Sequence, residues 1–137
     1  GGVMGGRGGA GGGAGTGGGF KLPALSGSEK QVSWAKDILT HPYDIMGSWA
    51  KSFERQADAF DKGGKGYGDA ERQTADAYKA AQKRYAQEVK SLGKMFPSGM
   101  KASQVIDMKP RINDMANYII KDEYKKRKIN PLNAQKV

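Results

Sequence analysis

The sequence predicts an all-α fold: a small antiparallel bundle of about four helices plus a short turn, behind a disordered glycine-rich N-terminal tail. Apolar residues recur three or four positions apart over long segments between residues 28 and 126, which is the period of one face of an α-helix. No alternating, β-branched segment competes with this pattern. The segments that join the expected helices are short, and short connections favour antiparallel neighbours.

Composition divides the chain into three parts. Residues 1–21 are mostly glycine, and glycine loses more backbone entropy on ordering than any other residue, so we expect a flexible tether there. Residues 22–130 are expected to form the helical domain, which at roughly 110 residues can bury a modest core. Residues 131–137 follow an Asn-Pro pair and are expected to be a frayed tail.

The first helix is expected over residues 29–39. Ser28 can cap it by accepting a hydrogen bond from the amide of Gln31, and the Gln31 side chain can reach back to the amide of Ser28, as in a capping box. Pro42 disfavours helical geometry at the residue before it. The helix is therefore expected to end near Thr40-His41.

Apolar stripes predict the remaining helices. Gly63 is a natural left-handed cap at the end of the second helix, and Asp69 can cap the third and longest. Pro110 separates a short turn from the last helix, whose basic end suits the negative end of the helix dipole. The expected ranges are 42–60, 70–94 and 111–126 for the helices and 104–108 for the turn.

The charge balance limits the classes of partner. Lys and Arg number 23 against 14 acids, a formal net charge of +9, which favours an anionic partner such as nucleic acid, an acidic protein face or lipid headgroups. No apolar segment approaches the roughly 20 residues that span a bilayer, and a glycine run is no secretory signal, so we expect no membrane partner. The absence of cysteine excludes disulfides and thiol chemistry.

Nothing in the sequence indicates an enzyme. His41 is the only histidine, and a catalytic base needs a nucleophile and an orienting acid that no spacing here supplies. One histidine without cysteine gives no zinc-ligand pattern. The acids are scattered as helix caps or as i,i+4 partners of basic residues, for example Asp122 with Lys126. We therefore expect no catalytic residue, no metal and no cofactor.

One aromatic residue marks the candidate protein-binding site. Trp34 lies off the apolar line of the first helix and is expected to be partly exposed. With Glu29 and Lys30 it forms a polar ridge where the tail joins the helix, and helix formation alone does not explain this ridge. Five other aromatic residues lie on apolar stripes and are expected in the core; they are Trp49, Phe53, Phe60, Tyr78 and Tyr85.

Two basic groups form the candidate nucleic-acid-binding site. Lysine and arginine side chains on a helix surface can contact phosphates weakly and without sequence preference. The alternative interpretation is a solvated surface that balances the helix dipole. The candidate residues are Lys79, Lys83, Arg84 and Lys90 on the longest helix, and Lys125, Lys126, Arg127 and Lys128 at the end of the last.

Residues 25–38 read Leu-x-Gly-Ser-Glu-Lys-Gln-Val-x-Trp-Ala-x-Asp-Ile. This pattern resembles a motif of small proteins from bacterial phages and mobile elements, in which an arginine usually follows; here Leu39 stands in its place. Residues 102–107 are similar to a later Ala-Lys-x-Trp-Ile-Asp-like segment, with Val105 replacing the tryptophan. The Gly-Gly-Arg-Gly run resembles linkers of phage minor head and head-morphogenesis proteins.

Two functional hypotheses follow from the residues and this resemblance. The first is a non-enzymatic structural or accessory module of a phage or mobile element, tethered by its glycine-rich linker, that binds a phage or host protein. The second is a basic helical domain of the same origin that binds nucleic acid. The resemblance implies the cytoplasm of a bacterial host, or the virion, as the location. A third hypothesis, an inhibitor of a host nuclease or defence complex, has no residue-level support.

Overall fold

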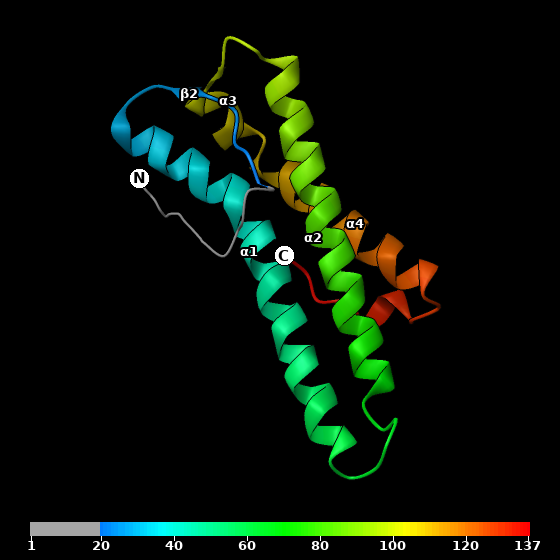
Figure 1. The fold of residues 1–137 in the computed structure, drawn as a ribbon. Helices are drawn as coiled ribbons and strands as arrows, with labels where there is room; N and C mark the ends of the chain where they lie inside the picture. Colours follow the sequence, from blue (N-terminus) through cyan, green and yellow to red (C-terminus); the bar gives the residue numbers. More distant parts are fainter. Residues whose placement is uncertain (1–19) are drawn as a thin grey trace.

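The computed structural model describes residues 20–137. The predicted glycine-rich tail lies outside these residues except for its last two positions. Within the described range the chain forms four α-helices and two short strands (Figure 1), which confirms the all-α fold. The elements are β2 (Leu25–Ser26), α1 (Glu29–Asp61), α2 (Asp69–Met95), β3 (Met100–Lys101), α3 (Ala102–Asp107) and α4 (Lys109–Lys126), followed by the 3-10 helix η2 (Pro131–Asn133).

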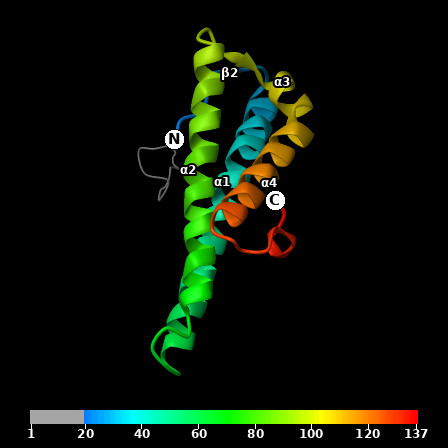
Figure 2. The same ribbon diagram turned by 90° about the vertical axis from the view of Figure 1, so that its right-hand side faces the viewer.

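Helices α1 and α2 form a long antiparallel hairpin, and the shorter helices cover only part of it. Figure 1 shows α1 and α2 side by side, with the loop between them at the bottom of the view. After a quarter turn, α4 is seen to lie along the upper part of the hairpin, and α3 sits near the start of α1 (Figure 2). The lower part of the hairpin therefore extends beyond the rest of the bundle. Among the helices of residues 20–137, none contains an apolar segment of the length that spans a bilayer.

Helix α1 is continuous over 33 residues, so the predicted helix end at Thr40-His41 is wrong. Pro42 lies inside α1 and is buried. A proline within a helix lacks the amide that would bond to the carbonyl four residues earlier, here that of Ile38, and typically costs about 3 kcal/mol. The hydroxyl of Tyr85 on α2 donates to the carbonyl oxygen of Leu39 at 2.6 Å, in the turn next to the proline.

Packing explains why α1 continues past its proline. Leu39 and Met46 are both buried, one on each side of Pro42, and their spacing keeps one apolar stripe on one face of the helix. Ending the helix at residue 41 would turn the second half of that stripe away from α2. Tertiary burial therefore outweighs the local preference of the proline.

The starts of the helices agree only in part with the prediction. The hydroxyl oxygen of Ser28 accepts a hydrogen bond from the amide of Gln31 at 3.2 Å, which confirms the predicted cap of the first helix. Asp69 was expected to cap the longest helix but is its first helical residue, and Gly68 occupies the capping position. That glycine is close to α1: a Cβ atom built on it would lie 2.1 Å from the carbonyl oxygen of Ala57.

The loop at the tip of the hairpin is held by one carboxylate. An Asp61 oxygen accepts from the amide of Gly68 at 2.8 Å, and the other forms an ion pair with Arg72 at 2.7 Å. The hydrogen bond from Gly68 and the contact with Arg72 lower the pKa of Asp61. The left-handed residue of this loop is Gly66, with φ of 86°, rather than the expected Gly63.

A two-residue parallel bridge, which the sequence did not predict, joins the chain start to the segment after α2. Leu25 pairs with Met100 and Ser26 with Lys101, and the amide of Met100 donates to the carbonyl of Ala24 at 2.8 Å. Each strand has only two residues, too few for a recognisable period. The bridge fixes residues 20–24 across the C-terminal end of α2.

Aromatic rings form the centre of the core. Tyr78 is fully buried; it stacks on Phe53 with ring centroids 5.8 Å apart and meets the edge of Tyr124 at 5.6 Å. Tyr85 is also buried, as predicted. Phe60 was expected in the core but is 51% exposed, because α1 ends at the next residue and only the hairpin loop follows.

The C-terminal residues pack on the bundle, which differs from the expected frayed tail. The amide of Gln135 donates to the hydroxyl of Tyr78 at 3.0 Å, and that of Val137 donates to the side-chain oxygen of Asn117 at 2.7 Å. Val137 and Ala134 also contact the hydrophobic core. The burial of these side chains holds the segment against the bundle, which the composition did not predict.

Candidate functional site

Trp34 is the exposed aromatic residue at the start of α1. The residue is 53% exposed, whereas Ala35 and Ile38 beside it are buried. Its indole N–H donates to no described residue, and about half of the residue remains exposed to solvent. Such an amphipathic side chain at a surface is typical of binding hot spots.

The predicted ridge of three residues becomes a pair in the structure. Glu29, Lys30 and Trp34 are all exposed. Lys30 precedes Trp34 by four residues in the same helix, which places the two side chains on one face. Glu29 precedes Trp34 by five residues and projects from another face. The helix thus brings Lys30 and Trp34 together and separates Glu29 from them.

Four of the eight predicted nucleic-acid-binding residues are engaged in ion pairs. Lys79 pairs with Glu54 of α1, and the other three contact two acids of α4, Asp122 and Glu123. A cation already paired with a carboxylate is less available to a phosphate. The paired residues are Lys79, Arg84, Lys126 and Arg127.

Glu123 is the centre of this ion-pair network. Its side chain is only 5% exposed. It forms ion pairs with Arg84 at 2.6 Å, Arg127 at 2.7 Å and Lys126 at 3.3 Å. Burial acts to raise the pKa of Glu123, but the hydrogen bonds from the three cations outweigh it and lower the pKa overall. The predicted i,i+4 pair of Asp122 with Lys126 is present at 3.5 Å. The network fastens α4 to α2, which is a structural role.

The other four predicted cations are exposed: Lys83, Lys90, Lys125 and Lys128. They divide between two helices. Lys83 and Lys90 lie on α2, whereas Lys125 lies near the end of α4 and Lys128 just beyond it. None of the four forms an ion pair with another described residue. The eight residues therefore do not make one continuous basic surface.

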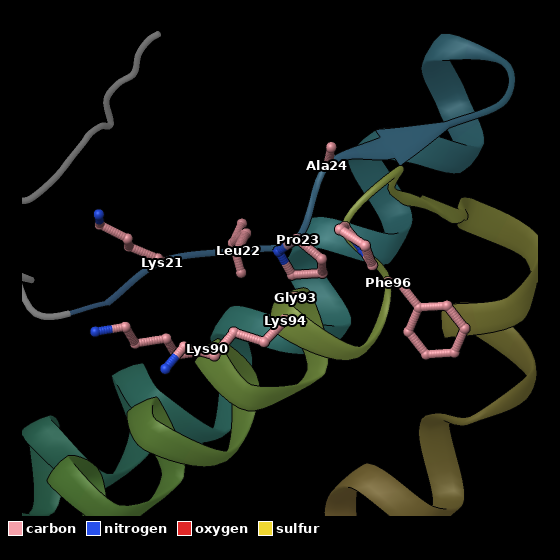
Figure 3. Close-up of a pocket in the computed structure, with 9 residues that line it drawn as sticks. Lys21, Leu22, Pro23, Ala24, Lys90, Gly93, Lys94 and Phe96 are labelled. Atoms are coloured by element: carbon pink, nitrogen blue, oxygen red, sulfur yellow. The ribbon is translucent and has the colours of Figure 1, made fainter.

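A cleft of about 280 Å³ adds two further lysines. It lies between residues 21–24 and the C-terminal end of α2, where Pro23 crosses over Gly93. Lys21 borders it on one side, and Lys90 and Lys94 border it on the other. Figure 3 shows the three side chains extending to the same side of the cleft. No local pattern predicts that Lys21 joins the lysines of α2, because the β2–β3 bridge and the stacking of Phe20 on Tyr43 bring it there.

The described residues contain no group of three or more His, Cys, Asp or Glu side chains that could hold a metal ion. His41 is exposed on α1, inside the helix rather than at the end where it was expected. Searches against protein-family models, curated proteins and solved structures found no match to this chain.

Proposed function

We propose that this protein is a non-enzymatic interaction module that binds a protein partner through Trp34 and Lys30 on α1. The exposure of Trp34, which is 53% for the residue, is the observation that carries the proposal. The core next to it is already filled by Ala35, Ile38 and Leu39, all of which are buried. The fold therefore leaves much of the Trp34 ring outside its own core.

The exposed area of the ring gives an estimate of the free energy that a partner gains by covering it. A tryptophan side chain has roughly 250 Å² of surface, so about half of it, near 130 Å², remains for a partner to cover. At about 25 cal/mol per Å², covering it contributes roughly 3 kcal/mol. A partner that accepts a hydrogen bond from the indole N–H and places an acidic group near Lys30 adds specificity to this apolar contact.

The resemblance of residues 25–38 to phage and mobile-element proteins supports the proposed biological setting. In that setting the partner is a phage or host component, the glycine-rich tail is the tether to a larger protein, and the location is the bacterial cytoplasm or the virion. The alternative, a nucleic-acid-binding domain that uses all eight predicted cations, has less support, because four of them are held in ion pairs.

The test uses the full chain as immobilised bait in a lysate of bacteria that carry the gene. The matched control for Trp34→Ala is Tyr118→Ala, since Tyr118 is an exposed aromatic (66%) on α4. A protein captured by the wild type is purified, and its affinity for each variant is measured. We expect Trp34→Ala to weaken binding by about 100-fold, which corresponds to roughly 3 kcal/mol, and Tyr118→Ala to leave it unchanged.

Circular dichroism of both variants completes the experiment. Trp34→Ala is expected to retain its helix content, because the side chain projects from the helix surface. Equal binding by the wild type and both variants contradicts the proposal. Unfolding of Trp34→Ala also contradicts it, since Trp34 would then be part of the core.

A further inference from the structure

Four lysines form a row along one side of the molecule. Lys83, Lys90 and Lys94 are exposed on α2, and their spacings of seven and four residues keep them on one face of the helix. The row extends over about 16 Å from the first to the third at 1.5 Å per residue. Lys21 joins it from the extended segment on the opposite side of the cleft (Figure 3). These four residues are called the lysine row below.

The lysine row differs from the other cations of α2 in forming no ion pair with a described residue. Lys79 and Arg84, on the same helix, are held by carboxylates of α1 and α4. No member of the row forms an ion pair within the described part of the chain. Lys94 lies in the last turn of α2, where it also balances the helix dipole, but this does not account for Lys21 or Lys83. The row therefore presents uncompensated positive charge.

We propose that the lysine row binds the phosphate backbone of double-stranded DNA without sequence preference. Along a duplex, phosphates of one strand recur every 3.4 Å of axis, so a row of about 16 Å faces four or five of them. Lysine is a compact cation on a flexible stem and meets such phosphates as a point charge. The site shares no residue with the Trp34 surface and does not rest on the function proposed above.

The aromatic side chains near the row favour a duplex over a single strand. Proteins that bind single strands stack the bases on exposed aromatic rings. Phe20, next to Lys21, is stacked on Tyr43 with ring centroids 4.4 Å apart. The ring of Phe96 points away from the three lysine amines at the cleft (Figure 3). A duplex, whose bases are already stacked, needs only the phosphate contacts that the row provides.

The row has a defined limit toward the tip of the hairpin. Asp76 precedes Lys83 by seven residues and is exposed, so its carboxylate lies on the same face of α2. A negative charge there repels a phosphate backbone. The site is thus confined to the C-terminal half of α2 and the segment around Lys21, and the C-terminal end of α2 points away from the hairpin loop in Figure 1.

Fluorescence anisotropy with a labelled 20-base-pair duplex tests the proposal. Each phosphate contact contributes about −0.9 to the slope of log K against log salt, so four contacts give about −3.6, or roughly a 100-fold loss of affinity between 50 and 200 mM salt. The triple variant Lys21→Gln, Lys90→Gln and Lys94→Gln is expected to reduce the slope to about −0.9.

The matched control removes the same number of charges elsewhere. Arg111, Lys121 and Lys125 are exposed on α4, and their triple replacement by Gln gives the same net charge as the first variant. We expect this control to bind the duplex with the wild-type slope. The single variant Lys83→Gln is expected to reduce the slope by about 0.9, and it gives an independent reading away from the cleft.

The possible outcomes separate clearly. If the two triple variants lose the same affinity for the duplex, only net charge matters and the proposed site is wrong. Absence of duplex binding at 50 mM salt overturns the proposal, as does stronger binding to vesicles with anionic lipid or to poly-glutamate than to the duplex. Trp34→Ala is expected to bind the duplex as the wild type does, so failure of the DNA site leaves the protein-binding proposal standing, and the reverse also holds.

Discussion

The hydroxyl of Tyr85 is expected to stabilise α1 at its internal proline. It donates to the buried carbonyl of Leu39 at 2.6 Å, and burial raises the pKa of Tyr85 far above its ordinary value, so the donor is protonated at neutral pH. Tyr85→Phe removes the hydroxyl with little change in ring volume. Loss of one partner of a buried hydrogen bond costs about 1–3 kcal/mol, and we expect about 1.5 kcal/mol here.

Thermal and urea unfolding measure this effect. At about 4 °C per kcal/mol for a domain of this size, Tyr85→Phe is expected to lower Tm by about 6 °C. The control is Tyr67→Phe, because Tyr67 is mostly exposed in the hairpin loop and its replacement should change Tm by less than about 2 °C. Equal shifts in the two variants would refute the assigned role of the hydrogen bond.

A double-mutant cycle tests whether the hydroxyl compensates for the proline. Pro42→Ala restores an amide that can donate to the carbonyl of Ile38, one residue before Leu39, so this turn of α1 is held by its own backbone and depends less on Tyr85. We expect Tyr85→Phe to cost less in the Pro42→Ala background, with a coupling energy of about 0.5–1 kcal/mol. Additive effects would show that the two residues act independently and would contradict this explanation of the continuous helix.

Two further perturbations test the packing and the ion-pair network. Gly68→Ala places a Cβ atom 2.1 Å from the carbonyl oxygen of Ala57, so unfolding experiments should show a loss of about 2–3 kcal/mol; the Gly64→Ala control meets only a loop side chain and should lose far less. Glu123→Gln should destabilise the protein by about 2–3 kcal/mol at pH 7. Because the folded-state pKa of Glu123 is lowered, its contribution is present above the unfolded pKa of about 4.3 and disappears as pH falls through the folded value. The stability difference from wild type should therefore shrink toward pH 3, and a difference independent of pH would contradict the charge-based account.

The fold class could be read from the sequence because the apolar period is strong. The stripes of α2 and α4 and the Ser28 cap depend on residues close in the chain, and these features agree with the structure. The break at Pro42 was wrong because a local rule was applied where contacts with α2 decide. The β2–β3 bridge pairs Leu25 with Met100, and the C-terminal Gln135 bonds to Tyr78, 57 positions earlier. No short-range pattern in the sequence predicts contacts between residues so far apart.

In the candidate sites too, some features could be predicted from the sequence and others depend on the fold. The exposure of Trp34 follows from its position off the apolar stripe, so helical periodicity alone could predict it. The ion pairs of Arg84 with Asp122 and Glu123 join positions nearly 40 residues apart, and a count of basic residues cannot tell such a paired cation from a free one. Lys21 reaches the lysine row only through the fold. The sequence thus showed which residues are charged, and the structure showed which charges are compensated.

The burial of Trp34 by a partner is the central claim, and acrylamide quenching measures it most directly. In the Trp49→Phe protein, Trp34 is the only tryptophan, so its fluorescence reports this position alone. Free protein is expected to be strongly quenched, as suits a half-exposed ring. Saturation with the protein captured by the wild-type bait should reduce the quenching several-fold and shift the emission to the blue. Unchanged quenching in a complex shown to form would contradict the account.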